Sequence, residues 1–441
     1  MAEVAAGAGV AIAAEEVVSR GAEVGLAAYM IAKPTMPLKA TYTRIATADD
    51  DPSRRSLSRS NHTLTVISNK AYIFGGETDH DDVASNDIHA ITIASTGKPD
   101  VDYSLIPAVP VETPTTTTAA VNDSNVPPAR TKHAACAFND SLAIYGGFST
   151  TGDLLREAST IWLFHPAQSA WSHLDTTDLQ FGPGPRSSPK LFATKTTLII
   201  YGGKGPNGED LSDVWRIDPL ERTWEQLPNA PVSTSNAAFT EDDGQLYLIS
   251  GSDPMSSSLH HIDLSVPVED MKWDTFTFPT NPVAPGPQPR HDAGLLPITT
   301  GYGRRYLVYF LGSKEKPKDA LPPPPEDDTH DVTQWSDIWT LQIPSSSLQP
   351  QASLSFSKAI KPAKIKDAIR SALGVESGQH TWAEAVVQPP PDFEIPEGKV
   401  HPGPRGFFGA DVAGDGCTVV FWGGQDAKGE RVGDGWTVKL E

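Results

Sequence analysis

One short pattern occurs six times in this chain: an apolar strand that ends in a pair of glycines or in a degraded version of one. The six stretches are AYIFGG (71–76), LAIYGG (142–147), LIIYGG (198–203), LYLISG (246–251), YLVYFLG (306–312) and VVFWGG (419–424). A second strand follows each of them and carries an aromatic residue or a histidine in register, at His89, Trp162, Trp215, His260, Trp339 and Trp436. A supersecondary unit repeated in this way predicts a closed ring of similar β-sheets.

Two further strands complete each copy. A third strand carries one aromatic residue, at Tyr103, Trp171, Trp224, Trp273 and Trp382, and the sixth copy has none. The stretch KATYTRIA (39–46) has Tyr42 in the aromatic position and no preceding strands of its own, so we expect it to complete the sixth copy. The fourth, innermost strand begins near Arg59, Arg130, Arg186, Ser233, Arg290 and Arg405. Sharing the last sheet between the two ends of the chain would cover the edges that an open ring exposes.

With its Arg-x-x-His starts, glycine pairs and spaced aromatic residues, the chain resembles the kelch-repeat β-propellers. The resemblance covers residues 39–441 and implies an all-β, six-bladed propeller. The blades are expected at about 57–107, 127–176, 184–230, 231–280, 288–388, and 403–441 together with 39–46. Three positions depart from the pattern, because Ser250 and Leu311 replace the first glycine and Ser233 replaces the arginine.

Segments outside the repeat are expected to be extensions or insertions. The Ala-rich residues 1–38 predict a helical or flexible extension, and residues 113–128 predict a solvated linker. Residues 314–332 carry four consecutive prolines, which favour polyproline II and suit either a spacer or a docking segment. The insertion at 345–380 contains KPAKIKDAIRSALGV (361–375), whose apolar residues recur at helical spacing and predict a short helix in the fifth blade.

Charge and cysteine content exclude several classes of function. The chain has 35 basic and 55 acidic residues and a net charge of −20, with no dense basic stripe, which argues against nucleic acid or an anionic membrane as partner. The two cysteines, Cys136 and Cys417, cannot form a disulfide framework and fit a reducing compartment. No apolar run reaches the ~20 residues of a membrane span. We therefore expect a cytoplasmic monomer.

The residues at the strand entrances are the first candidate binding site. They are Arg59, His62, Arg130, His133, Arg186, Arg290, His291 and Arg405. Arginines that converge at a central opening would capture carboxylates or phosphate by bidentate hydrogen bonds, as the rim arginines of kelch adaptor domains do for acidic peptides. The alternative is structural, since the same arginines can brace blades by capping backbone carbonyls.

A divalent metal is the second candidate. The first glycine pair leads into GGETDHDD, which supplies Glu77, His80 and Asp81, and carboxylates mixed with histidine can bind iron or zinc. Iron-binding specifier proteins of the kelch type use the pattern Glu-x3-Asp-x3-His, but here Ser85 stands where the histidine belongs. The copper site of galactose oxidase, another kelch relative, is not expected, because no matching set of Tyr, His and Cys is apparent.

These observations leave two classes of function open. The first is an interaction scaffold that binds a protein or peptide, preferably acidic, on the face that carries the loops after the glycine pairs, with no cofactor. The second is a small-molecule enzyme or specifier-type protein with a site at the channel mouth and a divalent metal. Whether the protein is catalytic is not decided by its fold, because propellers host both classes.

Overall fold

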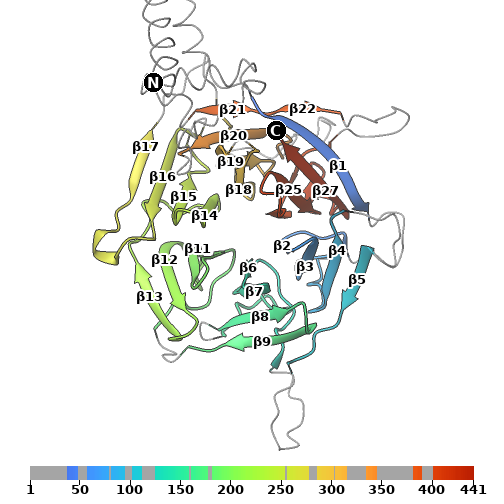
Figure 1. Ribbon diagram of the computed structural model, residues 1–441. Helices are drawn as coiled ribbons and strands as arrows, with labels where there is room; N and C mark the ends of the chain where they lie inside the picture. Colours follow the sequence, from blue (N-terminus) through green and yellow to red (C-terminus); the bar gives the residue numbers. More distant parts are fainter. Residues whose placement is uncertain are drawn as a thin grey trace, which may run out of the picture.

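Six sheets surround a central opening, like the blades of a propeller; five of them have four strands and the sixth has five (Figure 1). The computed structural model describes residues 37–47, 57–78, 81–94, 102–111, 125–157, 160–176, 181–253, 256–277, 286–301, 303–314, 334–344, 381–389 and 401–441. In the five four-stranded sheets all strands are antiparallel and follow the order of the chain from the centre outward. The all-β propeller expected from the repeat is confirmed.

The first three blades consist of consecutive strands. Blade 1 contains β2 (Thr63–Ile67), β3 (Lys70–Phe74), β4 (Ile88–Thr92) and β5 (Tyr103–Ile106). Blade 2 contains β6 (Ala134–Phe138), β7 (Ser141–Tyr145), β8 (Ile161–His165) and β9 (Ala170–Leu174). Blade 3 contains β10 (Lys190–Ala193), β11 (Leu198–Lys204), β12 (Asp210–Asp218) and β13 (Thr223–Leu227).

The next two blades repeat this arrangement. Blade 4 contains β14 (Ala237–Thr240), β15 (Gln245–Ile249), β16 (Ser258–Asp263) and β17 (Asp274–Thr277), with the 3-10 turn η4 (Val268–Asp270) before its last strand. Blade 5 contains β18 (Gly294–Thr299), β19 (Arg305–Phe310), β20 (Ile338–Ile343) and β21 (Trp382–Glu384).

Blade 6 combines strands from distant parts of the chain. It contains β24 (Gly409–Val412), β25 (Thr418–Trp422), β27 (Asp434–Leu440), β1 (Lys39–Thr47) and β22 (Val386–Gln388), and the short pair β23 (Arg405–Gly406) and β26 (Gln425–Asp426) lies beside it. β1 pairs antiparallel with β27, with Tyr42 opposite Val438 (Figure 1). The strand from the N-terminal part of the chain therefore closes the ring, as the sequence predicts.

β22 is a fifth strand that the sequence analysis missed. The chain leaves β21 at Ala385, whose amide donates to Ile338 in blade 5, and the amide of the next residue, Val386, donates to Leu38 beside β1. β22 then runs parallel to β1. The chain segment that leaves blade 5 thus forms β22, the outermost strand of blade 6.

The core is divided among the contacts between blades. Each of six clusters of buried apolar side chains joins two neighbouring blades, and the aromatic residues of the repeat are among their members. Trp162 and Phe164, for example, pack with Phe74 between blades 1 and 2. The aromatic side chains therefore stabilise the fold by filling the wedges between blades.

The glycine pairs allow the close approach of neighbouring blades. Gly75 has φ +61°, and a Cβ atom added there would lie 2.4 Å from the carbonyl oxygen of Arg130 in the next blade. No side chain fits at that distance, and only glycine adopts this φ without strain. The packing of neighbouring blades therefore requires glycine at this position.

Several predicted segments lie outside the described residues. They are the extension, apart from Pro37 and Leu38, residues 113–124 of the predicted linker, the insertion at 314–332 apart from Lys314, the whole insertion at 345–380, and His80. In the part of the chain that the structure describes, no helix is both long and apolar enough to span a membrane.

Candidate functional site

The arginines at the strand entrances lie inside the blades. Each guanidinium group donates to the carbonyl at the first position of the glycine pair in its own blade, at 2.8–3.1 Å. The five acceptors are Gly75, Gly146, Gly202, Leu311 and Gly423. Each arginine therefore ties the entrance of the innermost strand to the end of the next strand.

A carboxylate and an indole complete this brace in four blades. In blade 3, Arg186 Nη1 lies 2.7 Å from Asp213 Oδ1, and Trp215 Nε1 donates to Asp213 Oδ2 at 2.6 Å. The equivalent sets are Arg130–Glu157–Trp162, Arg290–Asp337–Trp339 and Arg405–Asp434–Trp436. In blade 1, Arg59 donates to Nε2 of His89 at 2.9 Å, and blade 4 has no arginine at this entrance.

This placement corrects the prediction of an arginine funnel. The side chains of Arg59, Arg130, Arg186, Arg290 and Arg405 are no more than 2% exposed, so they do not converge at the central opening. The sequence analysis left a bracing role open, and the structure supports it. A guanidinium buried with its carboxylate contributes to the blade rather than to a ligand site.

Two of the three candidate histidines are also buried. Burial and the nearby Arg59 guanidinium lower the pKa of His62 to about 3, and burial with Arg130 lowers the pKa of His133 well below its usual value. Both rings are therefore neutral at physiological pH. His291 differs, because its side chain is 43% exposed and its Nδ1 lies 2.6 Å from Asp292.

The candidate metal ligands meet an arginine. Arg431 Nη2 lies 3.1 Å from Glu77 Oε2 and 2.6 Å from Asp81 Oδ1, and its side chain is only 7% exposed. A cation is thus already supplied by blade 6 at the place where the sequence suggested a metal. Among the described residues there is no group of three or more His, Cys, Asp or Glu side chains placed to hold a metal ion.

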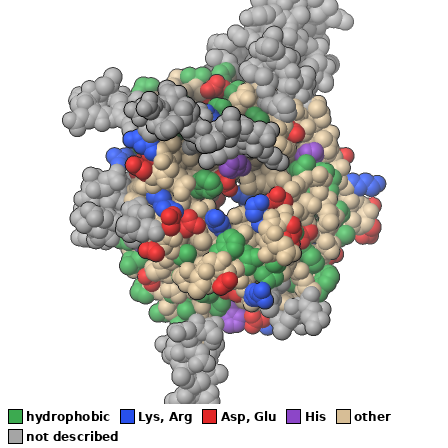
Figure 2. All heavy atoms as spheres, turned by 180° about the vertical axis from the view of Figure 1, so that it is seen from behind, with side chains coloured by type: hydrophobic (Ala, Val, Ile, Leu, Met, Phe, Trp, Pro, Cys, Tyr) green, Lys and Arg blue, Asp and Glu red, His purple; other side chains and the backbone are tan. Residues whose placement is uncertain are grey.

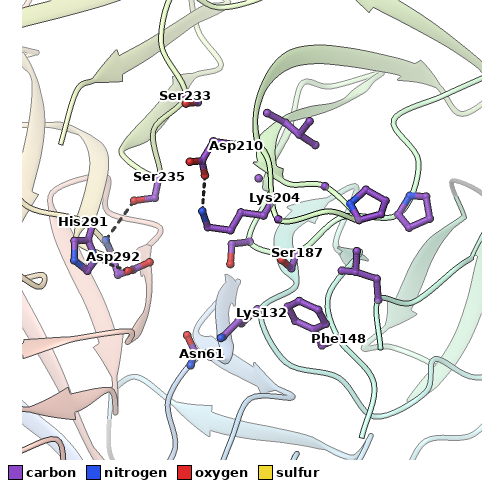
Figure 3. A pocket seen from close by; sticks show the side chains of 18 of the residues that line it. Asn61, Lys132, Phe148, Ser187, Lys204, Asp210, Ser233, Ser235, His291 and Asp292 are labelled. Atoms are coloured by element: carbon purple, nitrogen blue, oxygen red, sulfur yellow. Dashed lines mark hydrogen bonds and ion pairs between the residues drawn. The ribbon is translucent and has the colours of Figure 1, made fainter. Parts of the chain in front are cut away.

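A cavity of about 1760 Å³ opens on one face of the propeller. Its wall combines strand entrances with loops that follow the glycine pairs of blades 2, 3 and 4, including residues 148–156, 203–211 and 250–252 (Figure 3). The blades follow one another clockwise in Figure 1 and anticlockwise in Figure 3, so these figures view the propeller from opposite faces. The cavity therefore opens on the face that Figure 2 shows. On that face, charged side chains of both signs surround the central opening. The shared loop face expected from the repeat carries this cavity.

The mouth of the central channel is lined by one equivalent residue from each blade, which we call the mouth ring. In chain order the mouth ring consists of Asn61, Lys132, Ser188, Ser235, Asp292 and Phe407, all of which line the cavity. All of them except Ser235 have φ between +49° and +59°. Such φ values are uncommon in residues other than glycine and persist where the surroundings impose them.

Hydrogen bonds from blade to blade impose this conformation. The amide of Ser188 donates to the carbonyl of Lys132, that of Lys132 to Asn61, and that of Asn61 to Phe407, at 2.6–3.1 Å. The amide of Phe407 donates to Asp292 at 3.4 Å, and the amide of Asp292 donates to the hydroxyl of Ser235 at 3.3 Å (Figure 3). The mouth ring is therefore a fixed frame for its side chains.

The basic residues that line the cavity are not the arginines predicted at the strand entrances; they include Lys132, Arg156 and Lys204. Lys204 pairs with Asp210 at 2.5 Å, and both side chains are more than half exposed. Lys132 and Arg156 also line the cavity, and neither has an acidic partner within the part of the chain that the structure describes. Sequence reasoning missed Lys132. Its position, two residues after Arg130, is equivalent to that of Asn61 after Arg59 and that of Asp292 after Arg290.

Comparison with known proteins identifies the family. The family described as the KLHDC2/KLHL20/DRC7 Kelch-repeats domain matches residues 39–251, where the first glycine pairs and arginine entrances lie. The chain is a kelch-repeat β-propeller. A solved structure titled "Structure of YjhT" shares the fold, with a TM-score of 0.52, 12% identity, and coverage of 87% of this chain and 97% of that one.

Curated relatives of this kelch propeller are distant and longer than the matched region. Tip elongation aberrant protein 1 of Schizosaccharomyces pombe is 28% identical over 42% of this chain and 19% of its own length. Acyl-CoA-binding domain-containing protein 4 of Arabidopsis thaliana is 26% identical over 58% of this chain and 35% of its length. Human Kelch domain-containing protein 3 is 25% identical over 34% of this chain and 35% of its own length. The chain therefore matches only about a third or less of the length of these relatives.

Proposed function

We propose that this kelch propeller is an interaction scaffold that binds a peptide segment of a partner protein in the cavity on its loop face. The observation that carries the proposal is the cavity of about 1760 Å³, lined by loops of three neighbouring blades. Small-molecule pockets measure roughly 300–1,000 Å³, so this cavity suits a longer ligand.

The basic groups in the cavity support an acidic residue in that segment. Lys132 and Arg156 come from the same blade and have no acidic partner among the described residues. Both cationic side chains can attract a carboxylate to this part of the wall, which also contains Asp153 of the same loop. The preference for an acidic partner thus rests on these two side chains instead of the buried arginines.

The enzyme alternative receives less support. His62 and His133 are buried and neutral, and Glu77 and Asp81 bind Arg431. The residues expected to serve a metal-dependent reaction are therefore engaged in the fold. The scaffold remains the function that the described residues favour.

Photo-crosslinking tests the proposed surface. We would place a benzophenone amino acid at Thr151 or Ser252, which are exposed in the cavity wall, and at Leu220 as a control. Leu220 is 89% exposed in the turn between β12 and β13, on the opposite face. In cells that express the protein, we expect discrete protein adducts from the two cavity positions and none of these from Leu220.

The acidic preference is tested in the same assay. Reversing both charges with Lys132→Glu and Arg156→Glu should weaken the cavity adducts by about tenfold or more. Identical adducts from Leu220, or no adducts from Thr151 and Ser252, would contradict the scaffold proposal. Adducts that persist unchanged in the double variant would contradict the acidic preference alone.

A further inference from the structure

The mouth ring carries opposite charges on opposite sides of the channel. Lys132 belongs to blade 2 and Asp292 to blade 5, which are three positions apart in a ring of six blades. Equivalent positions in such blades face each other across the axis. Figure 3 shows Lys132 and Asp292 entering the cavity from different sides.

The backbone fixes the positions in the mouth ring from which the two charged side chains extend. Lys132 has φ +53° and Asp292 has φ +49°, and both belong to the chain of hydrogen bonds around the mouth. A residue held in this left-handed conformation by its neighbours cannot turn its side chain away by a local change of φ. The ring therefore presents one cation and one anion in a preorganised arrangement.

The surroundings of Asp292 suit a guanidinium group. Phe407, the next member of the ring, and His291 line the same part of the cavity, with ring centroids 6.3 Å apart. A carboxylate beside an aromatic face binds arginine through an ion pair and a cation–π contact. Two groups of the protein already contact this carboxylate: His291 Nδ1 lies 2.6 Å from Asp292 Oδ2, and the Lys190 ammonium group of β10 interacts with it electrostatically, so an arginine has to compete with both.

The surroundings of Lys132 suit a carboxylate. Its ammonium group lies 6.0 Å from the centroid of the Phe148 ring, and no acidic group pairs with it among the described residues. The side-chain amide of the neighbouring ring member Asn61 already donates to Glu77 Oε2 at 3.1 Å, so Lys132 is the group that this part of the ring offers to an anion. A carboxylate here would gain a charge-assisted hydrogen bond.

We propose that the mouth ring binds a dipolar peptide segment in one direction, with an arginine side chain at Asp292 and Phe407 and an acidic side chain at Lys132. This inference rests on the proposed scaffold function and specifies its ligand. The segment carries the two side chains at a fixed spacing and in a fixed order. Reversing the order would place like charges together, which disfavours binding.

The variants that change a charge introduce only residues that already occur in the mouth ring. Asn61 has φ +55°, so Lys132→Asn and Asp292→Asn keep a residue that tolerates this conformation. The exchange variant K132D/D292K swaps the charges. Phe407→Gly removes the phenyl ring, and glycine adopts the φ of +59° at this position without strain. Thermal unfolding confirms that each variant is folded.

A phage library of random dodecapeptides is selected on the full chain and on the exchange variant. We expect the full chain to enrich peptides with one arginine and one acidic residue in a preferred order, and the exchange variant to enrich the opposite order. In fluorescence anisotropy with an enriched peptide, Lys132→Asn, Asp292→Asn and Phe407→Gly should each weaken binding by about tenfold.

The outcomes separate this inference from the function on which it rests. Enriched peptides without a charge pair, or with the same order on both proteins, would overturn the dipolar segment while leaving the scaffold intact. If no peptide is enriched above a variant whose cavity is blocked by Thr151→Trp and Ser252→Trp, peptide binding in the cavity itself is contradicted.

Discussion

Acidification from pH 7 to pH 5 should lower the free energy of unfolding by several kcal/mol. Burial first, and then the nearby arginines, lower the pKa values of His62 and His89 to about 3, and that of His133 falls well below its usual value. In the unfolded chain these groups titrate near 6.5. Below that pH the unfolded chain therefore binds protons that the folded chain does not; His62 and His89 each cost about 2 kcal/mol at pH 5, and His133 acts in the same direction.

A buried carboxyl acts in the opposite direction. Burial raises the pKa of Asp411 to about 6, although its oxygens accept hydrogen bonds from the amides of Val66 and Val412. Its folded form keeps a proton at pH 5 that the unfolded form loses, which returns about 1 kcal/mol. The brace carboxylates of Asp213, Asp337 and Asp434 have lowered pKa values, so their contribution is lost only below about pH 4.

Urea unfolding at both pH values and constant ionic strength measures this effect. The wild type should unfold at a lower urea concentration at pH 5, and Asp411→Asn should show a steeper dependence because the offset is gone. An unfolding midpoint that is unchanged or higher at pH 5 would show that the three histidines are protonated in the folded protein.

Removal of one brace carboxylate should have the next largest effect. Asp337→Ala leaves the fully buried Arg290 guanidinium without its counter-ion, and Trp339 loses the acceptor for its indole N–H. Breaking one partner out of a buried pair typically costs 3–5 kcal/mol. We expect a loss of about 3 kcal/mol, since Asp337 itself is 21% exposed and water can partly replace it.

An exposed ion pair provides the matched control for this substitution. Lys204 and Asp210 lie 2.5 Å apart, but their side chains are 54% and 62% exposed. Asp210→Ala should therefore change the free energy of unfolding by less than about 1 kcal/mol. Urea unfolding of both variants at pH 7 measures this difference. If Asp337→Ala lowers the free energy of unfolding no more than Asp210→Ala does, Arg290 needs no counter-ion.

Those parts of the fold that depend on backbone geometry could be predicted from the sequence. The glycine pairs mark where neighbouring blades approach, and the Trp-centred strands mark the wedge between them, so six blades and the closing role of β1 follow from spacing alone. β22 could not be predicted, because it separates from β21 at Ala385 without a turn residue to mark the change of blade.

The site was less predictable because side chains of one motif point to different places. Arg130 and Lys132 are two residues apart, yet the first is buried in its blade and the second lines the cavity. A second signal was present in the sequence, since an acidic residue stands two positions before Trp215, Trp339 and Trp436. Recognising that these acids pair with the arginines would have assigned the arginines to the fold and directed attention to the mouth ring.

The pairing of β1 with β27 also has a consequence for biosynthesis. β1 ends at Thr47 and its partner begins at Asp434, so the first strand leaves the ribosome long before the strand that receives it. At roughly 5–20 residues per second, translation of the intervening chain takes on the order of 20–80 s. During that time β1 has unsatisfied backbone groups on both edges, and the nascent chain offers an open strand to chaperones and to other ribosome-bound copies until the last blade emerges.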